Sequence, residues 1–327
     1  MDINELNKKV LEENVKVKEV LGEIHKVIVG QEKLLERLLI GIFSGNHILV
    51  EGVPGLAKTL AVRTLAQCCD MEFKRIQFTP DLLPSDITGT QIYIPQKGEF
   101  LTKKGPVFAN FILADEINRA PAKVQSALLE AMQEKTVTIG DETYPLPDPF
   151  FVMATQNPIE QEGTYPLPEA QVDRFIMKVV ITYPEIDEER QIIEKVAIQK
   201  LPQVTKILKI DDTKRIKDLI SQIYIDEKIK NYCVALSDST RNPEKYGLEK
   251  IKPFIAWGVS PRATLHLIDS ARVKAFLEGR GFVIPEDVRD ILVDVFRHRI
   301  ILSYEGEAEE FTPEKIISEI LASVEVP

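Results

Sequence analysis

The first part of the chain shows two helical patterns of apolar positions. Over residues 1–28 apolar side chains recur at helical spacing among charged ones, which predicts an amphipathic helix. The sequence Val29-Gly30-Gln31 interrupts this pattern. A second amphipathic helix is predicted to follow, carried by Leu34, Leu35, Leu38 and Leu39. The chain therefore opens with two helices joined by a short break at a glycine.

Short apolar runs then alternate with further helical patterns. These strand-like runs are His47–Val50, Phe73–Phe78, Phe111–Ala114, Phe150–Thr155 and Phe175–Ile181. Such alternation predicts an α/β fold with a mostly parallel sheet covered by helices. Ligands of such sheets bind at the carboxyl ends of the strands, so polar residues that follow these runs are candidates for a functional site.

Two segments interrupt the alternation. Residues 85–105 are rich in glycine, threonine and β-branched residues, and predict a hairpin or an extended loop. Residues 135–147 place two short β-prone runs on either side of a Gly140-Asp141 turn, which predicts a second hairpin.

The pattern changes after Tyr183-Pro184, where no strong strand run remains. Helices are predicted near residues 187–199, 212–223, 226–238, 261–278, 286–298 and 313–322. Ser260-Pro261 and Thr312-Pro313 are typical helix starts, while Gly279 and Gly281 end the long helix. We therefore expect two domains, residues 1–184 with the sheet and residues 185–327 with a helical domain.

Composition narrows the class of protein. The 327 residues are 44% hydrophobic and 28% charged, as in soluble globular proteins, and the net charge of −10 disfavours broad DNA binding. The three cysteines and four scattered histidines lack the spacing of a metal site. We expect the adjacent Cys68 and Cys69 to be buried packing residues and the four histidines to be structural or surface groups. No apolar signal core or membrane-spanning stretch is present in the sequence, so we expect a soluble, cytoplasmic protein.

A phosphate-binding loop is the first candidate for chemistry. It follows the run Ile48–Val50 and consists of Gly52, Val53, Pro54, Gly55, Leu56, Ala57, Lys58, Thr59 and Leu60. Backbone N–H groups of such a loop, together with a helix N-terminus, point at phosphate oxygens. Lys58 would reach the β- and γ-phosphates, and the Thr59 hydroxyl would bind Mg²⁺. Ala57 stands where the usual pattern has glycine.

Two acids at the end of the run Phe111–Ala114 are the second candidate. Asp115 would hold Mg²⁺ through water, and Glu116 is suited to polarise the water that attacks a phosphoanhydride. The alternative is a strand that merely ends in polar loop residues. Together with the preceding phosphate loop, the acids favour binding of ATP with Mg²⁺.

These motifs resemble those of the MoxR family of AAA+ ATPases, and the resemblance covers nearly the whole chain. It is carried by Glu51–Thr59, Ala114–Gln133, Ala154-Thr-Gln-Asn-Pro158, Glu169-Ala-Gln-Val-Asp-Arg-Phe175 and Gly258-Val-Ser-Pro-Arg-Ala263. The family tolerates alanine at position 57. The resemblance implies a P-loop core with a parallel five-stranded sheet and a C-terminal all-α lid domain. The two hairpins would be the helix-2 insert and the pre-sensor 1 hairpin of this branch.

The resemblance also implies roles for single residues. Asn157 resembles sensor 1, Arg262 resembles sensor 2 on the lid, and Gly30 lies in the segment that lines the adenine pocket. Arg174 resembles the arginine finger supplied to the neighbouring subunit, and Arg119 is a second candidate for that role. The alternatives are a turn residue for Asn157, a surface arginine for Arg262, and a salt bridge to Asp173 or Glu169 for Arg174.

The implied function is ATP hydrolysis that remodels or matures a partner. The expected assembly is a homo-oligomeric ring, taken to be a hexamer, and the expected partner is a protein with a von Willebrand factor A domain. Alternatives are a metal-chelatase-type motor subunit, a nucleic-acid motor of the same AAA+ branch, and a scaffold that binds ATP without turnover. The hairpin lysines favour nucleic acid, but four acids offset them: Asp86, Glu99, Asp141 and Glu142.

Overall fold

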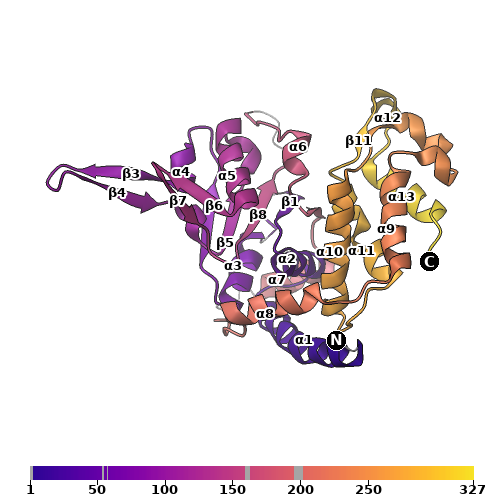
Figure 1. The fold of residues 1–327 in the computed structure, drawn as a ribbon, viewed down its shortest axis with the longest axis horizontal. Helices are drawn as coiled ribbons and strands as arrows, with labels where there is room; N and C mark the ends of the chain where they lie inside the picture. The colour runs from indigo at the N-terminus through magenta and orange to yellow at the C-terminus, as the bar shows by residue number, and fades with distance from the viewer. Residues whose placement is uncertain (1–2, 54, 57, 159–162, 195–201) are drawn as a thin grey trace. The chain divides into compact units, whose positions relative to one another are not determined.

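The structure is a computed structural model that describes residues 3–53, 55–56, 58–158, 163–194 and 202–327. The chain divides into two compact units (Figure 1). The sheet unit consists of Lys16–Arg174 and Val179–Lys214, and the helical unit consists of Met1–Val15, Phe175–Lys178 and Arg215–Pro327. The short segment after Arg174 thus belongs with the helical unit. The division of the chain at residue 184 stays a prediction.

The sheet unit is built on five strands in the order β2-β5-β8-β1-β9. They are β1 (Ile48–Gly52), β2 (Phe73–Gln77), β5 (Phe111–Asp115), β8 (Phe151–Gln156) and β9 (Met177–Ile181). β5 pairs in parallel with β2 and β8, and β8 pairs in parallel with β1. The five predicted strands and the parallel α/β fold are confirmed.

The sheet unit also contains helices. They are the end of α1 (Ile3–His25), α2 (Glu32–Ser44), α3 (Lys58–Cys68), α5 (Ala122–Glu134), α6 (Glu169–Val172) and α7 (Ile186–Ile193), with the start of α8 (Ile210–Ser221), which continues into the helical unit. α2 packs on β1 and β8 so closely that a Cβ at Gly41 would lie 2.4 Å from the Phe151 ring. Cys68 and Cys69 are buried at the end of α3, as expected of packing residues.

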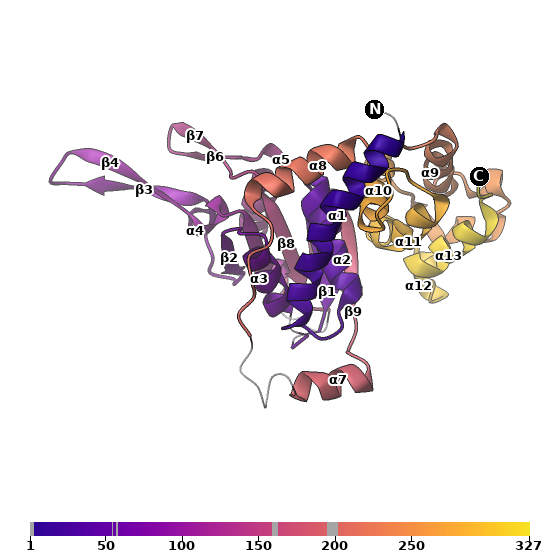
Figure 2. The same cartoon turned by 90° about the horizontal axis from the view of Figure 1, so that it is seen from below.

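Two hairpins extend from the sheet unit, as predicted (Figures 1 and 2). The longer one joins β3 (Gly89–Ile94) to β4 (Glu99–Lys104), and the shorter one joins β6 (Thr136–Ile139) to β7 (Glu142–Pro145). The Tyr144 hydroxyl links them by a 3.2 Å hydrogen bond to Thr102. A short helix that the sequence pattern missed, α4 (Pro84–Thr88), precedes the longer hairpin. The 3₁₀ turns η1 (Pro106–Phe108) and η2 (Ile117–Arg119) flank β5.

The helical unit confirms the predicted lid. It contains α9 (Glu227–Ser239), α10 (Pro261–Leu277), α11 (Pro285–Phe296), α12 (Tyr304–Ala308) and α13 (Pro313–Ser323), with 3₁₀ turns η4 (Pro243–Tyr246) and η5 (Glu249–Phe254). Two very short strands, β10 (Ile255–Trp257) and β11 (Ile301–Leu302), pair antiparallel beside these helices. Asn14 donates hydrogen bonds to the carbonyls of Phe276 and Leu277 at the end of α10. In the described part of the chain, no helix has the length and apolar character needed to cross a membrane.

Candidate active site

The predicted phosphate loop connects β1 to α3. β1 ends at Gly52 and α3 begins at Lys58, so the loop opens a helix N-terminus at the carboxyl edge of the sheet. Gly55 has φ +87°, a backbone conformation that L side chains rarely adopt. A Cβ at Gly52 would lie 3.0 Å from the carbonyl oxygen of Ile181 on the neighbouring strand. Backbone conformation thus favours glycine at position 55, and the close approach of Ile181 favours it at position 52. Pro54 and Ala57 lie outside the described residues.

The Lys58 side chain makes a contact across this loop. Its ammonium donates a 2.6 Å hydrogen bond to the carbonyl of Gly52, across the turn. Burial lowers the pKa of Lys58, and attraction to Asp115 and Glu116 opposes that shift. A half-buried cation at the start of a helix, attracted by two carboxylates, suits a polyphosphate with bound Mg²⁺.

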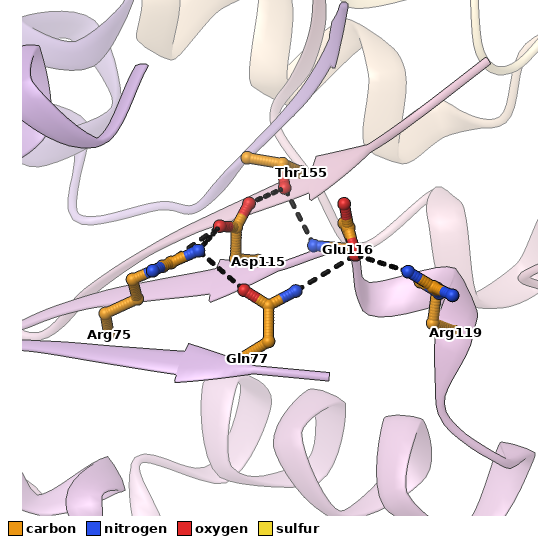
Figure 3. A network of polar contacts seen from close by, with 6 residues as sticks. All are labelled: Arg75, Gln77, Asp115, Glu116, Arg119 and Thr155. Carbon is orange, nitrogen blue, oxygen red and sulfur yellow. Dashed lines mark hydrogen bonds and ion pairs between the residues drawn. The ribbon is translucent and has the colours of Figure 1, made fainter. Parts of the chain in front are cut away.

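Asp115 ends β5 and is held on both carboxylate oxygens (Figure 3). Oδ1 accepts a 2.6 Å hydrogen bond from the Thr155 hydroxyl. Oδ2 accepts two hydrogen bonds from Arg75, at 3.0 Å from Nε and 2.6 Å from Nη2. Arg75 also donates to the Gln77 side-chain carbonyl at 2.6 Å. The carboxylate is thus oriented by a hydroxyl on one side and a guanidinium on the other.

Glu116 has a left-handed backbone, with φ +56° and ψ +52°. Such a conformation is uncommon for a residue other than glycine and is a source of local strain. The backbone N–H of Glu116 donates a 2.8 Å hydrogen bond to the Thr155 hydroxyl, which fixes this turn. The Oε2 of Glu116 accepts a hydrogen bond from Gln77 at 3.0 Å and one from Arg119 at 3.3 Å. The carboxylate is therefore oriented from two sides (Figure 3).

Three members of this network were missed by reasoning from sequence: Arg75, Gln77 and Thr155. Arg75 and Gln77 alternate on β2, so both project toward the same face of the sheet, and the register sets Gln77 opposite Asp115. Polar residues at alternate positions of a strand near the acids were the available signal. Thr155 is a buried hydroxyl one residue before the end of β8. Thr155 could be assigned to the site only once the pairing of β8 with β5 was known, and the sequence alone does not give that pairing.

A small apolar pocket lies beside the loop. It is lined by Val27, Ile28, Val29, Leu56 and Leu60, among others. Gln31 also lines it and donates a 3.2 Å hydrogen bond to the Leu56 carbonyl. The Gln31 side-chain oxygen is buried, with no hydrogen-bond partner among the described residues. Such an acceptor beside an apolar slot fits a flat base that carries an amino group.

Gly30 bends the chain at this pocket. It has φ +62°, and a Cβ there would lie 2.1 Å from a Glu188 carboxylate oxygen. Both the backbone conformation and the close approach favour glycine.

The described donors fit Mg²⁺ shared with a nucleotide. Within those residues no cluster of three or more histidine, cysteine, aspartate or glutamate side chains could hold a metal alone. Asp115 and Thr59 nevertheless supply a carboxylate and a hydroxyl beside the phosphate loop. Mg²⁺ is typically bound in this way, by one or two carboxylates plus substrate phosphates.

The remaining predicted residues lie on separate elements. Asn157 is buried directly after β8, at the same sheet edge as Asp115. Arg174 is half-buried in the turn before Phe175, and its side chain makes no ion pair with Asp173 or Glu169 in the described structure. Arg262 is exposed in the first turn of α10, in the helical unit.

Comparison with known proteins accounts for this arrangement. The profile of the "ATPase family associated with various cellular activities (AAA)" matches residues 47–177, and an "AAA lid domain" profile matches residues 249–320. "Chaperone MoxR1" of Mycobacterium tuberculosis is 51% identical over 93% of this chain and 81% of its own length. The chain belongs to the MoxR family of AAA+ ATPases.

Other MoxR-like proteins extend the comparison. "Uncharacterized protein YeaC" of Bacillus subtilis is 41% identical over 93% of this chain and 92% of its own length. A crystal structure from Cytophaga hutchinsonii, described as a candidate ATPase, is 53% identical, with a TM-score of 0.94 over 100% of this chain and 99% of that one. The resemblance and the AAA+ fold are thereby confirmed, while the roles of single residues stay predictions.

Proposed function

We propose that this MoxR-family protein binds ATP with Mg²⁺ at the Gly52–Lys58 loop, hydrolyses it, and uses the cycle to remodel or mature a partner protein. The observation that carries the proposal is the network around Asp115 and Glu116. It orients two carboxylates beside a phosphate loop, and a hydrolase needs such an arrangement whereas a packing motif does not.

The residues divide the chemistry between them. Lys58 and the loop N–H groups would bind the β- and γ-phosphates, and the Gln31 oxygen would accept from the adenine amino group. Glu116 would take the proton of the attacking water through Oε1, since the contacts described at its carboxylate use Oε2. Mg²⁺, held by Asp115 and Thr59, would neutralise phosphate charge. Asn157 would orient the water or the γ-phosphate.

We propose that Arg174 completes the site of the neighbouring subunit in a ring, and that Arg262 senses the nucleotide from the lid. The support for Arg174 is that its guanidinium makes no ion pair in the described structure. Arg119, the other candidate for the trans role, contacts Glu116 of its own chain at 3.3 Å. Arg119 is therefore better suited to orient Glu116 in cis.

Subunit mixing tests the shared site. Arg174→Ala and Lys58→Ala should each be inactive alone. In a 1:1 mixture about a quarter of the interfaces should join an intact loop to an intact arginine and regain activity. A mixture of Lys58→Ala with Glu116→Gln, two defects of the same pocket, is the matched control and should stay inactive. Failure of the first mixture to recover activity would refute the trans role of Arg174.

The partner class that we propose is a protein with a von Willebrand factor A domain, and this rests on family resemblance. A nucleic-acid motor is less well supported, because one hairpin lysine is engaged within the fold. Lys104 lies 4.9 Å from the ring centroids of both Phe108 and Tyr144. ATPase stimulation by DNA that disappears as salt rises would favour the motor instead. Recovery of an A-domain protein with a Glu116→Gln trap would support the proposed partner.

A further inference from the structure

A buried arginine lies in the turn after α11, far along the chain from the acids. Arg299 is 6% exposed, yet it carries a full positive charge. Its Nη2 donates to the carbonyl of Phe175 at 2.6 Å and its Nη1 to the carbonyl of Ile176 at 3.1 Å. It also donates to the carbonyl of Val295. Burial of a guanidinium costs free energy because the charge loses its hydration. The hydrogen bonds from its rigidly placed N–H donors offset part of that cost.

The carbonyls that Arg299 binds belong to the two residues directly after Arg174. Phe175 and Ile176 are fully buried. His298 adds a third contact, because its Nε2 lies 3.2 Å from the Phe175 carbonyl. Residues 175–178 are part of the helical unit, whereas Arg174 is the last residue of its stretch of the sheet unit. Donors from the helical unit therefore fix the backbone to which Arg174 is bonded.

His266 connects Arg299 to α10. Its Nδ1 lies 2.6 Å from Arg299 Nη2 and must accept, because a guanidinium can only donate. Burial, together with the charges of Arg299 and Arg262, lowers the pKa of His266 to about 3. His266 is therefore neutral, with its proton on Nε2. It lies one turn after Arg262 on the same helix face.

These contacts form a continuous path. Arg262 stands at the start of α10, His266 follows one turn later, Arg299 bonds His266, and the Phe175 carbonyl bonds Arg299. A shift of α10 would move the acceptor of Arg299, and Arg299 would carry the backbone beside Arg174 with it.

We propose that Arg299 is a positioning residue for Arg174 and that, with His266, it couples the nucleotide-sensing helix of the lid to the arginine offered to the next subunit. This rests on the proposed trans role of Arg174. Misplacement of a catalytic group by about 1 Å can cost on the order of 10²-fold in rate. A role in lid stability alone would instead lower activity through unfolding, in every assay and every mixture.

Arg299→Lys tests the proposal in the full-length protein, because lysine keeps the charge but loses the planar fork. We expect nucleotide affinity within about twofold of wild type and a fall in kcat on the order of 10- to 10²-fold. A 1:1 mixture with Lys58→Ala should recover activity as Arg174→Ala does. The control is Arg289→Lys, which alters an α11 arginine that donates to Leu321 and Tyr232 instead. It should keep wild-type kcat.

The outcomes separate the two proposals. If Arg174→Ala is not rescued by Lys58→Ala, the trans role itself is wrong. If Arg174→Ala is rescued and Arg299→Lys is not, or if Arg299→Lys keeps wild-type kcat, the positioning role is wrong. Should Arg299→Lys fail to fold, His266 decides the question. His266→Gln, which retains an acceptor, should keep more activity than His266→Leu, and only the leucine variant should need rescue; equal activities would overturn the proposal.

Discussion

Arg75 offers a quantitative test of the metal-binding side of the site. Its two hydrogen bonds to Asp115 both end on Oδ2, at 3.0 and 2.6 Å, so Arg75 holds an oxygen of the carboxylate assigned to Mg²⁺. Arg75 therefore competes with Mg²⁺, and with the waters bound to it, for that carboxylate. Arg75→Met removes the cation and keeps a side chain of similar reach. Nucleotide binding should then need less Mg²⁺.

The structure sets the size of the effect. Two unit charges 4 Å apart attract by about 4 kcal/mol at an effective dielectric constant of 20 and by about 1 kcal/mol in water. The Arg75 side chain is 49% exposed and that of Asp115 17%, so the pair belongs near the lower limit. A contribution of about 0.5–1 kcal/mol corresponds to a two- to fivefold lower Mg²⁺ midpoint in the variant.

The assay is calorimetric ADP binding at a fixed nucleotide concentration with increasing Mg²⁺. Arg75→Lys, which keeps a charge beside Asp115, should fall between wild type and Arg75→Met. Arg63→Met, which removes an exposed arginine of α3 outside the network of Figure 3, controls for net charge. An unchanged or higher midpoint in Arg75→Met would refute the competition between Arg75 and the metal.

Two further predictions concern the base pocket and pH. Gln31→Leu removes the buried oxygen assigned to the adenine amino group, so the preference for ATP over GTP in competition binding should fall about tenfold; an unchanged ratio would exclude Gln31 from base recognition. Burial lowers the pKa of His47 to about 4 and that of His266 to about 3, from 6.5. The unfolded chain therefore binds more protons below pH 6.5, and at pH 5.5 each histidine should remove about 1.4 kcal/mol of unfolding free energy. Urea unfolding at pH 7.5 and 5.5 checks this, with a smaller loss expected in His47→Gln; equal stability at the two pH values would contradict it.

The local pattern of apolar and polar residues predicted the strands and the site residues that directly follow them. The apolar runs placed all five strands within one or two residues, and the residues at their ends gave Lys58, Asp115 and Glu116. Arg75 and Gln77 were missed because their role comes from the register of β2 against β5. α4 was missed because one turn of helix is too short to show a period.

The contact between Arg299 and Phe175 could not be predicted from local sequence patterns either. It joins residues 124 positions apart. No periodicity indicates that residues 175–178 belong with the helical unit, because their apolar run reads as the start of a strand, and Met177 does begin β9. Tertiary pairing alone brings these segments together.

The central claim is that the chain hydrolyses ATP with Glu116 as the base, and Glu116→Gln tests it most directly. Glutamine keeps the shape of the side chain but cannot take a proton, and a general base contributes on the order of 10²–10⁴-fold in rate. ATP binding and single-turnover hydrolysis should be measured on the same preparation. The variant should bind ATP within a few-fold of wild type while hydrolysis falls by at least about 10²-fold. Hydrolysis at the wild-type rate would contradict the account.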